Sequence, residues 1–130
     1  MGEKGQIVRR SIGIVFSDGG LLALSAVRPK HAEGHGEEEI AAVLCSADGA
    51  PVEISDTLLS TEYGPGGVQR RASFELWVDD EDEQPLRGAG TLISATSVEH
   101  SGLRGRIAFF RWSVEGREGL GHYEVVQADG

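Results

Sequence analysis

Hydrophobic and polar residues alternate along much of this chain with the two-residue period of β-strands, and helical periodicity is nearly absent. Runs rich in β-branched and aromatic residues are separated by turn sequences such as "SDGG", "ADGA" and "GPGG". The turn spacing predicts eight strands, at residues 7–16, 21–28, 37–47, 51–63, 68–79, 86–99, 104–115 and 118–127. The pattern indicates an all-β fold with at most one short helix.

Eight antiparallel strands that follow one another in sequence can close into a lipocalin-like up-and-down β-barrel. Such a barrel has no free sheet edge and can enclose space for one small ligand. A two-sheet β-sandwich is the alternative. The meander order favours the barrel, and a length of 130 residues predicts a single domain over residues 1–130.

The sequence "GPGG" at 64–67 predicts a three-residue hairpin loop, because its proline presets φ and its last glycine can adopt the left-handed conformation. The register that follows places Glu62 opposite Arg70 and Ile54 opposite Val78. Opposite charges then meet at the rim and apolar residues meet inside, so register and hydrophobic pattern agree.

The last hairpin predicts the aromatic lining of the interior. A turn at Gly116 and Arg117 sets Trp112 across from Gly121, and Phe110 across from Tyr123. These aromatic residues share the more apolar face of their strands. We expect Trp112, Tyr123 and Phe110 to line the interior, where a tyrosine hydroxyl and an indole N–H can orient a ligand.

Small residues in the strand at 86–99 bear on whether the interior is filled. Gly88, Ala89 and Gly90 would leave space inside a barrel. The alternative is that glycine marks a tight bend in this strand.

Charge and composition exclude several partner classes. The chain has 12 basic and 21 acidic residues, a formal net charge of −9. This charge argues against nucleic acid and anionic membranes as partners, since both are polyanions. The single cysteine, Cys45, excludes an internal disulfide, and no apolar stretch resembles a signal peptide or a spanning helix. These features predict a soluble cytoplasmic protein.

The stretch "KHAEGHGEEEI" contains His31 and His35, four residues apart and followed by three glutamates. A zinc hydrolase motif needs two such histidines on one helical face with a glutamate after the first, but Ala32 follows His31 and glycines flank His35. We therefore expect no metal and no other cofactor, and a polar loop at the barrel mouth in which His35 covers a bound ligand.

Asp56 is a candidate acid or base. It alternates onto the same face as Ile54 and Leu58, which the register assigns to the interior. A carboxylate among apolar neighbours is costly unless hydrogen-bonded, and desolvation raises its pKa toward a value useful for catalysis. The alternative is that this strand has a β-bulge, or that Asp56 pairs with Arg70 or a hydroxyl.

Arg111, His122 and Glu124 form a second constellation, because the last hairpin gathers them on one face. Glu124 could orient the His122 imidazole while Arg111 holds an anionic or carbonyl ligand. The opposite face is the more apolar, so an ordinary polar exterior is the favoured interpretation.

The C-terminal sequence "FFRWSVEGREGLGHYEVVQ" resembles the closing hairpin of the lipocalin-related family of carotenoid 1,2-hydratases and their AttH-type relatives. The matching residues are Gly119, Gly121 and Glu124. The resemblance implies a lipocalin-like barrel that acts on hydrophobic isoprenoid-like or polyketide-like substrates. Members carry two such modules in tandem, so the resemblance implies a single module, a homodimer that mimics the pair, or part of a longer protein.

Three functions follow. The first is a binding module that holds a hydrophobic or amphipathic ligand in its cavity. The second is a cofactor-independent hydratase, cyclase or isomerase that uses Asp56, or His122 with Glu124. The third is an interaction domain without a cavity. The residues expected to contact a ligand are Trp112, Tyr123, Phe110, Asp56 and His35.

Overall fold

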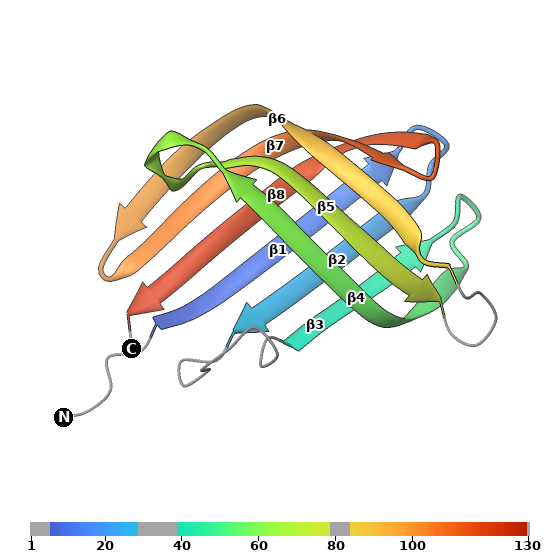
Figure 1. Cartoon of the computed structure of the whole chain (residues 1–130), viewed down its shortest axis with the longest axis horizontal. Coiled ribbons are helices and arrows are strands. Elements are labelled where there is room, and N and C mark those ends of the chain that lie inside the picture. The colour runs from blue at the N-terminus through green and yellow to red at the C-terminus, as the bar shows by residue number, and fades with distance from the viewer. Residues whose placement is uncertain (1–5, 29–38, 79–83, 130) are drawn as a thin grey trace.

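A computed structural model describes residues 6–28, 39–78 and 84–129 of the chain. Eight strands account for nearly all of them (Figure 1). The strands are β1 (Gln6–Phe16), β2 (Leu21–Arg28), β3 (Glu39–Cys45), β4 (Pro51–Tyr63), β5 (Gln69–Val78), β6 (Leu86–His100), β7 (Leu103–Val114) and β8 (Arg117–Asp129). A short 3-10 turn, η2 (Pro65–Gly67), joins β4 to β5, and the described residues include no α-helix.

The strands form one closed antiparallel barrel in which each strand pairs with its neighbours in sequence and β1 pairs with β8 (Figure 1). The predicted up-and-down barrel is therefore confirmed, and the sandwich alternative is wrong. β1 begins and β8 ends at the same end of the barrel, which we call the terminal end. The other end, with the β1–β2, β3–β4 and β7–β8 hairpins, is the turn end.

Inward-facing side chains form rows around the wall, because residues paired across strands point to the same face. From the terminal end inward, the rows along β7, β8, β1, β2 and β3 are Arg104, Gln127, Val8 and Arg28; Arg106, Val125, Arg10, Ala26 and Ile40; Ala108, Tyr123, Ile12, Leu24 and Ala42; Phe110, Gly121, Ile14, Leu22 and Leu44; and Trp112, Gly119 and Phe16. The first two rows are rich in arginine, and the last three rows are apolar.

Aromatic rings fill the half of the barrel nearer the turn end, and glycines make room for them. The Trp112 ring packs against those of Phe110, at 5.1 Å between centroids, and Phe74, at 5.7 Å. A Cβ on Gly88 would lie 2.3 Å from the Phe74 ring, and one on Gly90 2.5 Å from the Trp112 ring. The small residues of β6 therefore accommodate aromatic rings and leave no space beside them.

An ion pair and a cation–π contact cover the turn end. Arg117 lies 2.8 Å from Asp18, and its guanidinium stands 4.3 Å from the centre of the Phe16 ring. The hydrogen bond from Arg117 lowers the pKa of the Asp18 carboxyl, with help from the Gly20 amide. This cover shields the aromatic half of the interior from the turn end.

Two bulges change the predicted register of β4 and β5. The pair Ile54 and Val78 is confirmed, but Glu62 lies opposite Arg71 and not Arg70. Irregularities after Ile54 and after Glu62 each shift the pairing, so the register between them differs from the prediction by one residue. A one-residue shift moves every side chain of the segment to the other face.

The β7–β8 turn lies one residue earlier than predicted. Glu115 and Gly116 both have positive φ, as a two-residue type I′ turn requires. Trp112 consequently pairs with Gly119 in place of Gly121. The pairing partner changes by two residues, so the predicted inward face of both strands is retained.

Candidate functional site

The interior near the terminal end combines arginines with a buried hydroxyl pair. Tyr123 is fully buried, and its hydroxyl lies 2.5 Å from the Thr61 hydroxyl. This contact crosses the barrel interior, since Tyr123 belongs to β8 and Thr61 to β4. Arg10, one row nearer the terminal end, adds its positive charge and a hydrogen bond to the Tyr123 phenol.

Burial raises the pKa of the Tyr123 phenol above its ordinary value of 10.0, while the Thr61 hydrogen bond and the charge of Arg10 oppose the rise. The buried phenol therefore stays protonated at neutral pH. The phenol makes its hydrogen bonds to Thr61 and Arg10, and the guanidinium of Arg10 offers donors to an anionic or carbonyl group.

Gln69, on β5, hydrogen-bonds the backbone of β7 and β8 beside Tyr123. It is fully buried, and its Nε2 donates to the Tyr123 carbonyl at 2.9 Å and the Arg106 carbonyl at 3.2 Å. Its Oε1 is buried and has no hydrogen-bond partner among the described residues. Gln69 therefore joins β5 to β7 and β8 through backbone groups.

Apolar side chains face inward yet remain half-exposed where β3 and β4 separate. Pairing between these strands covers only Val43 to Cys45 with Pro51 to Glu53. Beyond it, several half-buried hydrophobic residues pack against the core from one side: Ile40, Ala42, Ile54 and Leu59. The terminal half of the barrel therefore has an accessible apolar inner wall beside its arginines.

The aromatic residues predicted to line the interior do face inward. Trp112, Phe110 and Tyr123 are each 0 % exposed. Full burial means that no water-sized space lies beside them, so their half of the interior is packed. Their role as ligand contacts stays a prediction, and of the three only Tyr123 carries a polar group that reaches the arginine rows.

The predicted interior position of Asp56 is wrong. The bulge after Ile54 turns Asp56 and Leu58 outward, and both are exposed. The Asp56 carboxylate accepts a hydrogen bond from the Thr57 amide at 2.9 Å. Thr57 is instead the buried residue. Asp56 therefore cannot anchor a ligand from the inner wall.

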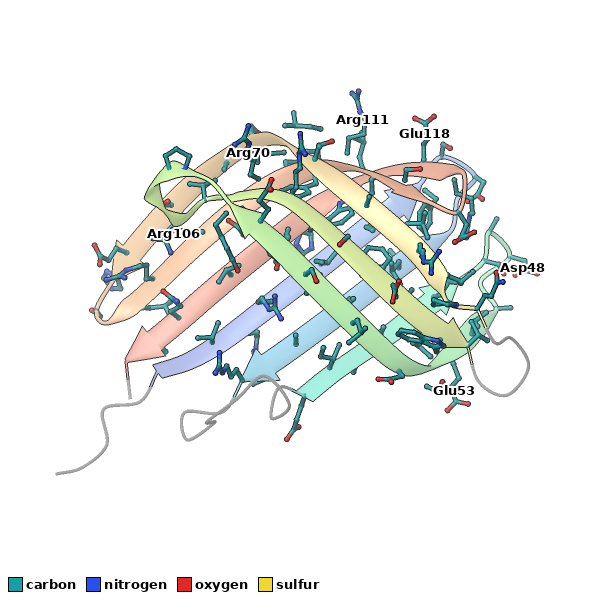
Figure 2. All side chains as sticks on the ribbon, in the orientation of Figure 1. Asp48, Glu53, Arg70, Arg106, Arg111 and Glu118 are labelled. Carbon is teal, nitrogen blue, oxygen red and sulfur yellow. The ribbon has the colours of Figure 1, made fainter. Side chains whose placement is uncertain are left out.

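His122 and Glu124 lie on the outer face of β8, as the favoured interpretation predicted. The His122 Nδ1 is 3.2 Å from a Glu124 carboxylate oxygen, within ion-pair distance but without hydrogen-bond geometry. Figure 2 shows Arg111 and Glu118 pointing away from the barrel. The structure thus places these charged groups outside, on strands other than that of Asp56.

The predicted polar loop at 30–36 cannot be compared with the structure. His31 and His35 lie outside the described residues. Among the residues that are described, no three His, Cys, Asp or Glu side chains are grouped so that they could hold a metal ion. In the same part of the chain, no helix is long and apolar enough to cross a membrane.

A groove of about 830 Å³ crosses the outer wall over β4 to β7. A row of small outward residues forms its floor: Ser60, Ser73, Ala89 and Ser113. Glu62, Arg71 and Arg111 line one side. The groove therefore results from small side chains on the exterior and is separate from the inner space expected of a ligand-binding barrel.

Sequence reasoning missed Arg10 and Thr61. Arg10 alternates with Val8, Ile12 and Ile14, which all face inward, so the two-residue period of β1 would have placed it inside. Thr61 could not have been placed in this way, because the bulge after Ile54 reverses the faces of β4.

The closed, antiparallel, eight-stranded up-and-down barrel has the architecture of lipocalin-like proteins. Comparison with known proteins adds no closer assignment: no protein-family model and no curated protein matches the chain. The resemblance of the last hairpin to the carotenoid hydratase family stays a prediction.

The raised pKa of Tyr123 predicts a pH effect on stability. The unfolded chain ionises its phenol near the ordinary value of 10.0, whereas the folded barrel keeps Tyr123 protonated to higher pH. This contribution is complete below pH 10.0 and is lost as the pH rises through the raised pKa of the folded state. We expect the free energy of unfolding, measured in urea at about pH 9 and about pH 11, to fall more in the wild type than in Tyr123→Phe. Equal losses would contradict the burial of this phenol.

Proposed function

We propose that the protein binds a small amphipathic molecule with an anionic head at the terminal end of the barrel. Arg10, which hydrogen-bonds the buried Tyr123 hydroxyl, holds the head, and Arg28 lies one row further out. The apolar part of the ligand lies against Ile40 and Leu59. This proposal keeps the binding module expected from the sequence and moves its site away from the packed aromatic half.

The arrangement of arginines is the observation that carries the proposal. Along β7, β8, β1, β2 and β3, the two rows nearest the terminal end contain four arginines, and on β6 Glu99 adds one acidic residue to the outer row. Only 12 of the 130 residues are basic, and the chain carries −9 overall. Arg104 is paired with Glu99 at 3.3 Å, and Arg10 hydrogen-bonds the Tyr123 phenol.

Guanidinium groups suit a carboxylate, because their fixed fork of donors matches its two oxygens. Arg106 lies further around the wall, where a Cβ on Gly67 would meet its guanidinium at 3.1 Å. We therefore assign the head to Arg10, and treat Arg106 as a source of positive potential.

The half-exposed inner wall supports an apolar tail. Ile40, Ala42, Ile54 and Leu59 face inward, pack against the core and are only partly buried. Covering such surface contributes about 25 cal/mol per Å² of apolar area. Specificity for an amphipathic ligand then follows from an apolar wall and a cationic row in the same half of the barrel.

Binding is favoured over catalysis because the candidate acids and bases lie apart from this region. Asp56 is on the outer face of β4, and His122 and Glu124 are on the outer face of β8. An acid–base mechanism needs such groups within hydrogen-bond reach of one reacting molecule. The hydratase, cyclase or isomerase of the sequence hypothesis therefore has less support than a binding protein.

Isothermal titration with decanoate, and with decan-1-ol as its uncharged counterpart, tests the proposal. We expect Arg10→Met to weaken decanoate binding at least tenfold, since a hydrogen bond to a charged group contributes about 1.5–3 kcal/mol. Binding of the alcohol should change little. Arg28→Met should weaken decanoate several-fold, and Arg111→Met on the outer wall is the matched control.

Circular dichroism identifies any variant that fails to fold. If Arg10→Met does not fold, decanoate binding by Arg28→Met, a change at the rim, tests the proposal in its place. Two results would reject the proposal: no saturable binding of decanoate to the wild type, or equal weakening by Arg10→Met and Arg111→Met.

A further inference from the structure

One outer face of the barrel is unusually apolar and carries little charge. It consists of outward residues in three adjacent rows across β7, β8, β1, β2 and β3, and we call it the β8 face. Its rows are Arg111, Leu120, Val15, Leu21 and Cys45; Phe109, His122, Gly13, Ala23 and Val43; and Ile107, Glu124, Ser11, Ser25 and Ala41.

Large hydrophobic side chains on the β8 face are exposed to solvent. Val15 is 60 % exposed, Leu120 48 % and Phe109 46 %, and three more exceed a third: Leu21, Val43 and Ile107. Isolated exposed hydrophobic residues are normal, but contiguous apolar patches mark surfaces that contact another molecule. Since β8, β1 and β2 are paired on both edges, contact here must be made by side chains.

Charge on this face is low and balanced. Its fifteen positions include one arginine, one glutamate and one histidine, although the chain carries −9. Glu124 and His122 are within 3.2 Å of each other. Homodimer interfaces are apolar and depleted of charge, whereas nucleic acids and anionic membranes are recognised through positive charge. Two copies of a −9 protein repel each other least where acidic residues are few.

The β8 face has both a depression and an apolar ridge. A depression of about 470 Å³ lies over small residues, including Gly13, Ala23 and Ala41. In the adjacent row Leu120, Val15 and Leu21 form an apolar ridge. A two-fold interface places the same patch on both subunits, so the ridge of each copy can enter the depression of the other.

We propose that the β8 face binds a second copy of this chain, forming a two-fold homodimer by face-to-face packing of the two barrel walls. The inner ligand site and this outer face are separate, so the dimer does not depend on ligand binding. Fifteen residues a side is somewhat fewer than the roughly 20–30 of a standard interface, so the proposed interface is a small one and its affinity has to be measured.

Sedimentation velocity over roughly 1–200 μM, a span bracketing micromolar affinity, is the first test. We expect the wild type to approach twice its 13.8 kDa chain mass at high concentration. Val15→Lys and Leu120→Lys should remain monomeric over the whole range. Leu58→Lys is the matched control, because Leu58 is an outward residue of β4 with 56 % exposure, and it should dimerise like the wild type.

The native Cys45 gives a second readout that needs no variant at this face, since it lies at the edge of the ridge row. Its alkylation rate should fall several-fold between dilute and concentrated wild type. A wild type that stays monomeric, a dimer that persists in Val15→Lys, loss of the dimer in Leu58→Lys, or an alkylation rate independent of concentration would each overturn the proposal.

Discussion

Gly121→Ala should unfold the barrel or lower its free energy of unfolding by roughly 4 kcal/mol or more. A Cβ on Gly121 would lie 1.8 Å from the carbonyl oxygen of Gly13, far inside contact distance. Both groups belong to paired strands that close the barrel, so neither can move without breaking the β1–β8 ladder. Urea denaturation followed by circular dichroism measures the loss.

Gly105→Ala is the matched control, because Gly105 lies on β7 beside β8 and a Cβ there would meet nothing within 4 Å. Alanine at such a position changes stability by no more than about 1 kcal/mol, and it can stabilise by restricting the unfolded chain. Similar losses in both variants would show that glycine is needed for backbone conformation and that the close approach at Gly121 is not the cause.

The same close packing gives a structural reason for the Gly-x-Gly sequence of β8. A Cβ on Gly119 would lie 2.7 Å from Ile14, and the Phe16 ring is also within 3.1 Å. Gly119 pairs with Trp112 on one side and Phe16 on the other, while Gly121 pairs with Phe110 and Ile14. The motif that resembles the hydratase family can therefore be explained by barrel closure, without a role in binding.

Much of the fold could be predicted because two signals, turn sequences and alternation, act locally. Every predicted strand is present, with ends that differ by no more than two residues. The "GPGG" loop also forms as expected, with the Gly64 amide donating to the Val68 carbonyl at 2.8 Å and Gly67 at a φ of 78°. Local residue choices determine these features, so distant parts of the chain need not be known.

The bulges of β4 could not be predicted, because they depend on how the strand packs against its neighbours. The alternation through Asp56 and Leu58 is regular in sequence, yet the bulge after Ile54 places both outside. β4 crosses from β3, with which it shares only three residue pairs, to a long pairing with β5. A bulge increases strand twist at such a crossing.

The candidate site likewise combines a feature set by local sequence with contacts set by packing between distant strands. Simple alternation along β1 places Arg10 inside. Its hydrogen bond to Tyr123, and that of Tyr123 to Thr61, involve side chains from other strands. The contact between Tyr123 and Thr61 joins residues 62 positions apart in sequence. A pattern along one strand shows which face a residue takes, and only the closed barrel shows what lies opposite it.

Trp112→Ala should lower the free energy of unfolding by roughly 3–5 kcal/mol, because it removes a fully buried indole and leaves a cavity. Trp112 is 0 % exposed and lies between the Phe110 and Phe74 rings. A loss of that size is a large share of the roughly 5–15 kcal/mol of an ordinary domain, so thermal unfolding should begin well below that of the wild type.

The cavity itself supplies the sharper test. An apolar cavity of this kind stays dry and binds an aromatic molecule of matching size, so added indole should stabilise Trp112→Ala and leave the wild type unchanged. Trp77→Ala is the control, because Trp77 is half-buried on the outer face of β5 opposite Asp56. Its loss should be smaller and should show no rescue by indole. Rescue of neither variant, together with a small loss in Trp112→Ala, would mean that the aromatic half is loosely packed. In that case a ligand could reach Trp112 and Phe110, and the binding site would extend from Arg10 into the centre of the barrel.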